Sequence, residues 1–118
     1  MRVPILKQRQ CLIASVQDAL SDAELRDLQQ RLAEDVGDHG VVGVLIDVTV
    51  LDVIDSFATR TLSTIAYTVK LRGADVVIVG IQPEVAFAMV QLGLTLEGVR
   101  TALDLDEGLA LLGEARNH

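Results

Sequence analysis

The stretch VVGVLIDV, residues 41–48, decides the fold class. It is apolar almost throughout and shows no alternation of apolar and polar residues, which is typical of a strand covered on both faces. The stretch ADVVIVGI, residues 74–81, has the same character. Two such strands with a helix between them predict a largely parallel sheet with right-handed crossovers.

Residues 56–72 predict the helix between these two strands. Their apolar side chains recur at helical spacing and form one stripe, made of Ala58, Leu62, Ile65, Ala66 and Val69. Lys70 and Arg72 fall in the expected last turn, where positive charges interact favourably with the helix dipole. Gly73 follows as a stop signal.

The rest of the chain repeats this alternation. Residues 3–8 and 11–16 predict two short strands joined by a tight connection. Residues 82–93 predict a short helix, residues 99–105 a weaker and partly exposed strand, and residues 104–116 a final helix.

Residues 21–40 predict a longer helix between the second and third strands. Ser21 is followed three residues later by Glu24, which is the pattern of a capping box. Gly37 and Gly40 are expected to end this helix.

The predicted order ββαβαβαβα defines an α/β fold with a mixed, mostly parallel sheet of about five strands and four helices. One domain over residues 1–118 is expected, because the length suits a single core. In such sheets the functional residues gather at the carboxyl ends of the strands. Residues 47–56 fall at that edge.

The charge of the chain narrows the classes of function. There are 10 Lys+Arg against 17 Asp+Glu, a formal net charge of −7. Such a surface repels nucleic-acid phosphates and anionic membranes, so neither is expected as a partner. No apolar run approaches the ~20 residues of a membrane helix, and the start lacks a signal peptide, which favours the cytoplasm. The single cysteine, Cys11, is interpreted as a small buried apolar residue.

Asp47, Asp52 and Asp55 precede Ser56 and raise the question of a metal site. Carboxylates suit Mg²⁺, and a receiver-like protein phosphorylated on Asp47 is one reading. Such a site normally needs a further acidic pair after the first strand and a lysine after the last, and this chain lacks both. No metal and no cofactor are therefore expected.

A serine nucleophile is a second reading of Ser56. The elbow pattern G-x-S-x-G is absent, and neither His39 nor His118 is an obvious base partner. The chain also has no glycine-rich phosphate loop. An enzyme is therefore not expected.

Two readings remain for Ser56 at the start of its helix. Asp55 or Ser56 could be the N-cap, a role worth ~1 kcal/mol. Alternatively, Ser56 is an exposed phosphate acceptor, since phosphorylation would add roughly −1.5 to −2 charge to a surface that is already acidic. Such a change suits a switch that ejects a bound partner.

The stretches VLIDVTVLDVIDSFATRTL, residues 44–62, and LRGADVVIVGIQPEVAFAMVQLGL, residues 71–94, resemble the STAS domain, named for sulphate transporters and anti-sigma factor antagonists. The specific elements are PILK at residues 4–7, IDSF at residues 54–57 and GIQPEVA at residues 80–86. The chain is most similar to the small single-domain scaffold subunit of the bacterial stressosome. The resemblance extends over nearly the whole chain.

The resemblance implies a non-enzymatic regulatory protein of the cytoplasm. The family subunit forms oligomers, at least dimers, and assembles with larger STAS paralogues. It sequesters a serine switch kinase, and phosphorylation by that kinase at the serine of D-S-F, here Ser56, releases the kinase. The released kinase activates a stress-response pathway, often through an alternative sigma factor, and a separate phosphatase resets the serine.

The residues after Ser56 separate two branches of the family. Simple anti-sigma factor antagonists usually show D-S-S-G-L, whereas this chain has D-S-F-A-T. The difference favours the stressosome branch over a simple antagonist that binds an anti-sigma serine kinase directly. Thr59 and Thr49 are secondary acceptor candidates, with a surface or capping role as the other interpretation.

Three neighbours of the acceptor are expected to contact the kinase. Asp52, Asp55 and Phe57 would form this contact face. Phe57 lies beside the apolar stripe of its helix, so a core position is the alternative for this side chain.

Overall fold

The structure is a computed structural model that describes residues 3–96 and 98–116. The chain begins with two antiparallel strands, β1 (Ile5–Gln8) and β2 (Cys11–Ser15). Arg9, one of the two residues that join them, has a φ of 57°. A positive φ in a two-residue connection matches the twist of antiparallel strands. The two tightly joined strands expected from the sequence are confirmed.

Parallel units follow β2. The elements are α1 (Asp22–His39), β3 (Gly43–Asp47), α2 (Ser56–Leu71), β4 (Asp75–Val79), α3 (Pro83–Gln91), β5 (Arg100–Ala102) and α4 (Leu105–Arg116). The strands form one sheet in the order β1-β2-β3-β4-β5, in which β1 and β2 are antiparallel and the other neighbouring pairs are parallel. The α/β fold and the order ββαβαβαβα are confirmed.

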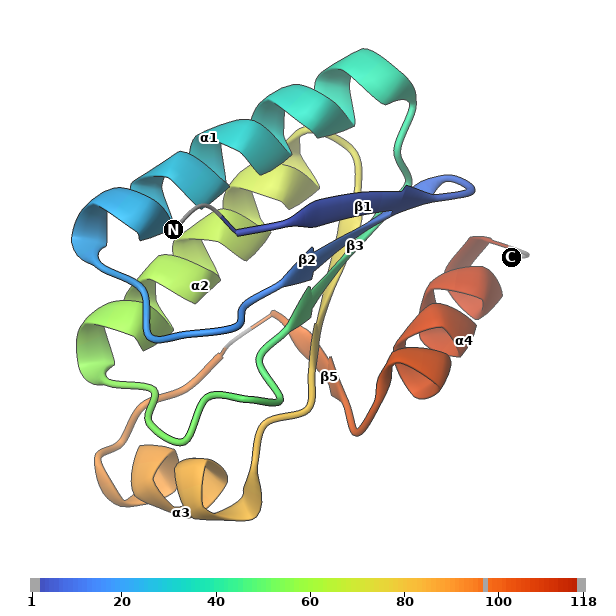
Figure 1. Ribbon diagram of the computed structural model, residues 1–118. Coiled ribbons are helices and arrows are strands. Elements are labelled where there is room, and N and C mark those ends of the chain that lie inside the picture. The colour runs from blue at the N-terminus through green and yellow to red at the C-terminus, as the bar shows by residue number, and fades with distance from the viewer. Residues whose placement is uncertain (1–2, 97, 117–118) are drawn as a thin grey trace.

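The helices divide between the two faces of the sheet. Each crossover advances by one strand in the same direction, so right-handed connections place α1, α2 and α3 on one side. The core on that side joins these helices to one set of alternate strand residues: Leu12, Ala14, Val44, Ile46, Val76 and Ile78. The intervening strand residues, such as Leu45 and Val77, pack with Leu112 of α4 on the other side. Figure 1 shows α4 alone on that face.

Helix α1 starts as the sequence predicts but ends differently. The Ser21 hydroxyl accepts from the backbone N–H of Glu24 at 3.2 Å, and the Glu24 carboxylate accepts from the N–H of Ser21 at 3.1 Å. Gly40 ends the helix with a φ of 62°. The expectation for Gly37 was wrong, because α1 continues through it. A Cβ there would overlap the guanidinium of Arg72, the C-cap residue of α2, so this glycine leaves room for that side chain.

Strand β5 is shorter than residues 99–105. Within the described residues it pairs with β4 alone, over three residues. The Asp104 carboxylate accepts from the backbone N–H of Glu107 at 2.9 Å, which is the geometry of a helix cap. The cap turns the chain into α4 and thereby ends the strand.

Candidate functional site

The candidate site lies in the connection from β3 to α2, at the edge of the sheet where the parallel strands have their carboxyl ends. Asp55 is the N-cap of α2, and its Oδ1 accepts from the N–H of Ala58 at 2.7 Å. The backbone carbonyl of Asp55 accepts from the N–H and the hydroxyl of Thr59, each at 2.9 Å. Asp55 alone therefore caps the helix, and the Ser56 hydroxyl is not needed for this purpose.

Ser56 is the first residue of α2 and is exposed. Among residues 3–96 and 98–116, its hydroxyl has no hydrogen-bond partner. A hydroxyl in this state is accessible to an enzyme, and its modification breaks no contact of the described fold.

The other two hydroxyls considered as acceptors differ from Ser56. Thr59 is only 2 % exposed and donates to the carbonyl of Asp55. A kinase could reach it only if the first turn of α2 opened. Thr49 is exposed, but its hydroxyl donates to Oδ1 of Asp47 at 2.5 Å. Both threonine hydroxyls are thus engaged, which leaves Ser56 as the accessible and uncommitted one of the three.

The loop between β3 and α2 is held by the end of β4 and by the loop that follows it. The N–H of Val48 donates to the carbonyl of Val79 at 2.9 Å. The side chain of Gln82 donates to the carbonyl of Thr49 at 2.6 Å. Gly80, with a φ of 83°, lies so close to Thr49 that a Cβ would overlap its side chain. The loop that leads to Ser56 therefore has a defined position.

Apolar side chains are exposed in the loop before Ser56 and at the residue directly after it. Phe57 is 37 % exposed, so the structure places it at the surface rather than in the core. Val50 and Val53 are more exposed still, at 60 % and 69 %. Asp52 is exposed in the same loop. The sequence analysis did not predict that either valine belongs to the site. Both are apolar and lie in a loop that buried Ile54 already anchors, which was an available signal for a contact surface.

An apolar pocket of ≈ 110 Å³ is lined in part by Asp55. Its walls include Leu20 from the loop before α1 and Leu51 and Val53 from the loop before α2. Pockets that bind small molecules usually measure about 300 Å³ or more. The size of this pocket suits one inserted side chain rather than a cofactor.

The described residues give no support to a metal centre. They contain no group of three or more histidine, cysteine, aspartate or glutamate residues placed to hold an ion. Oδ1 of Asp47 instead accepts from the backbone N–H of Thr49 at 2.9 Å, besides the threonine hydroxyl. Cys11 is half-buried in β2. The side chain of His39 and the residue His118 lie outside what the structure describes.

A helix that crosses a membrane must be both long and apolar, and this applies to each helix that the structure describes. None of them combines the length and the apolar character that a bilayer span requires.

Comparison with known proteins identifies the class to which this fold and site belong. The family model for the STAS domain matches residues 2–108. The chain belongs to the STAS domain family.

Two particular relatives are proteins named RsbRA and RsbS. The RsbT co-antagonist protein RsbRA of Bacillus subtilis (strain 168) is 32 % identical over 98 residues, which cover 74 % of this chain and 36 % of the relative. The chain thus spans about a third of that curated relative. A serine-to-glutamate variant of Moorella thermoacetica RsbS has a TM-score of 0.85 at 33 % identity, with both chains fully covered.

A second solved structure is described as the molecular architecture of the stressosome, a signal integration and transduction hub. It has a TM-score of 0.82 at 33 % identity, covering 98 % of this chain and 100 % of the other. The resemblance to stressosome proteins expected from the sequence is confirmed.

Proposed function

We propose that this chain is a non-enzymatic regulatory subunit of a stressosome that sequesters a serine switch kinase and releases it when Ser56 is phosphorylated. It acts in the cytoplasm as one domain, forms at least dimers, and assembles with larger STAS paralogues. A separate phosphatase resets Ser56, and the freed kinase drives a stress-response pathway. The full-length similarity to RsbS and to a stressosome chain supports this assembly.

The observation that carries the proposal is the state of the Ser56 hydroxyl. It is exposed, held at the first position of α2, and has no hydrogen-bond partner among the described residues. Exposed Val53 precedes it by three residues and exposed Phe57 follows it directly, and both offer a partner apolar contact area. Asp52 and Asp55 add negative charge to the same face. A docked kinase would therefore lie directly over the residue that it modifies.

Electrostatics explain why modification would release the partner. The helix N-terminus favours an anion by about 0.3–1 kcal/mol at an exposed site. A unit charge ~6 Å from one carboxylate is disfavoured by roughly 0.7 to 2.8 kcal/mol, for effective dielectric constants from 80 to 20. Asp55 cannot turn away from the phosphate without losing its bond to the N–H of Ala58. The face therefore becomes strongly anionic, and a partner matched to the unmodified face loses its fit.

The test is phosphorylation by a candidate switch kinase with ATP, followed by mapping of the modified residue. We expect one phosphate on Ser56 and none in Ser56→Ala. Ser63→Ala is the matched control in the same helix and should be modified like the unaltered protein. Full modification of the Ser56→Ala protein at another residue would refute the proposal.

A binding experiment tests the release step. Ser56→Asp should capture the kinase more weakly than the unaltered protein at equal concentration and salt, with an unchanged circular dichroism spectrum. Equal capture would count against the switch. Co-purification of larger STAS paralogues separates the stressosome assembly from a simple anti-sigma factor antagonist, which would pair only with its kinase.

A further inference from the structure

Helix α2 has an unusual charge composition for this protein. The chain contains 17 Asp+Glu, yet the sequence of α2, SFATRTLSTIAYTVKL, has no carboxylate. Its two basic residues are Arg60, one turn after Ser56, and Lys70 in the last turn. Lys70 stabilises the helix dipole where it lies, but a cation near the helix N-terminus does not. The helix dipole therefore does not explain why Arg60 lies in the first turns of α2.

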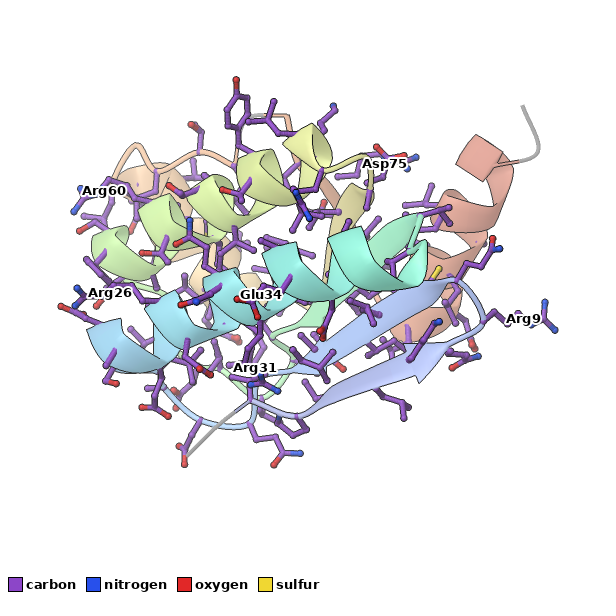
Figure 2. The ribbon with its side chains drawn as sticks, turned by 90° about the horizontal axis from the view of Figure 1, so that it is seen from above. Arg9, Arg26, Arg31, Glu34, Arg60 and Asp75 are labelled. Carbon is purple, nitrogen blue, oxygen red and sulfur yellow. The ribbon has the colours of Figure 1, made fainter. Side chains whose placement is uncertain are left out.

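The surroundings of Arg60 leave its guanidinium available. Arg60 is exposed, and in the part of the chain that the structure describes its side chain makes no hydrogen bond or ion pair. Its neighbours on the helix surface are Ser56, Phe57, Ser63 and Thr64, which are all uncharged. Figure 2 shows the Arg60 side chain pointing outward from α2.

We propose that Arg60 is the internal receptor for a phosphate on Ser56 and pairs with it once the serine is modified. The inference rests on the proposed function for the identity of the modified residue. Residues four apart on a helix have Cβ atoms about 5–6 Å apart, and an acidic group before the basic one is the better order. Helical side chains also lean toward the N-terminus, which brings Arg60 toward Ser56.

Arginine suits this role better than lysine does. Its planar guanidinium can donate two parallel hydrogen bonds to phosphate oxygens. Asp55 repels the same phosphate from the loop side, because its carboxylate is fixed by the 2.7 Å bond to the N–H of Ala58. Repulsion from the loop and attraction from the helix together direct the phosphate onto the first turn of α2, on the side of Arg60.

The pairing changes two charges at once. The modified face gains a phosphate, and it loses the free cation of Arg60 as a group that a partner could contact. The phosphate also takes one defined position rather than sampling all rotamers of Ser56. Arg60 thus acts as a positioning residue of the switch.

The second ionisation of the phosphate measures the pairing directly. The protein is produced with phosphoserine incorporated at position 56 during translation, and its ³¹P chemical shift is followed against pH. Arg60→Gln should raise the pKa of this ionisation, ordinarily about 6, by roughly 0.3 units, or about twofold in the dissociation constant. The shift corresponds to about 0.4 kcal/mol, as for other helical ion pairs.

Lys70→Gln is the matched control, since it removes the same charge from the same helix. It lies 70 − 56 = 14 residues further along α2. That spacing is about 21 Å, more than twice the ~8 Å Debye length at physiological salt. We expect no shift for this variant, and Arg60→Lys should keep part of the effect. Circular dichroism checks that each variant keeps its helices.

A phosphate pKa that is the same in the unaltered protein and in Arg60→Gln would overturn the proposal. So would an equal rise in Lys70→Gln, because the effect would then reflect net charge alone. The result does not depend on which residue a kinase selects, because phosphoserine is installed directly. A kinase that fails to modify Ser56 would refute the proposed function without altering this measurement.

Discussion

Replacing Asp55 with alanine tests whether this side chain, and not Ser56, holds the start of α2. The substitution removes the acceptor that lies 2.7 Å from the N–H of Ala58. Loss of an N-cap typically costs about 1 kcal/mol, and loss of a negative charge near the helix N-terminus adds about 0.3–1 kcal/mol. Unfolding entropies of about 2.1 cal/mol/K per residue imply about 0.25 kcal/mol/K for 118 residues. We therefore expect the midpoint of thermal unfolding to fall by roughly 5–8 °C.

Two companion variants make the result specific. Asp55→Asn keeps a capping oxygen and loses only the charge, so its midpoint should fall by less than half as much. Asp52→Ala removes an exposed acid from the same loop and should change the midpoint by about 2 °C or less. Thermal unfolding followed by circular dichroism measures all three. Equal shifts for Asp55→Ala and Asp52→Ala would refute the assignment of Asp55 as the cap.

Two further predictions concern packing and the loop. Gly108→Ala should destabilise the protein by roughly 1–2 kcal/mol, because the new Cβ would overlap the buried Leu45 side chain. Gly113→Ala in the same helix meets no described atom within 4 Å and should stabilise by up to about 1 kcal/mol; denaturant unfolding compares the two. Gln82→Ala removes the 2.6 Å bond to the carbonyl of Thr49 and should speed amide hydrogen exchange in the loop between β3 and α2 by about fivefold. Exchange at the unaltered rate would show that this bond does not hold the loop.

The element order was predictable because the pattern of apolar and polar residues within each element indicates which of its faces are buried. The runs at residues 41–48 and 74–81 are apolar because both faces of β3 and β4 are covered. The capping box of Ser21 and Glu24 is likewise a local pattern, and it forms as expected. The prediction that Gly37 helps to end α1 was wrong, because the role of this glycine depends on Arg72, which is distant in sequence.

The site was predictable in its location but not in its contacts. Asp55 and Ser56 are both good capping residues, so only the three-dimensional structure could show that Asp55 caps α2 and leaves Ser56 uncommitted. The burial of Thr59 could have been recognised, since it lies three residues before buried Leu62 on the same helix face. The bond from Gln82 joins residues 33 apart in sequence, and no local pattern reveals such a contact.

The sequential strand order β1-β2-β3-β4-β5 has a consequence for synthesis on the ribosome. Each new strand emerges next to the strand that was made just before it, and the sheet extends at one edge only. No strand has to be inserted between two that are already paired, so the nascent chain can add its units in the order of translation. The β3–α2 junction with Ser56 can therefore form while α4 is still inside the ribosome, and α4 covers the remaining face last.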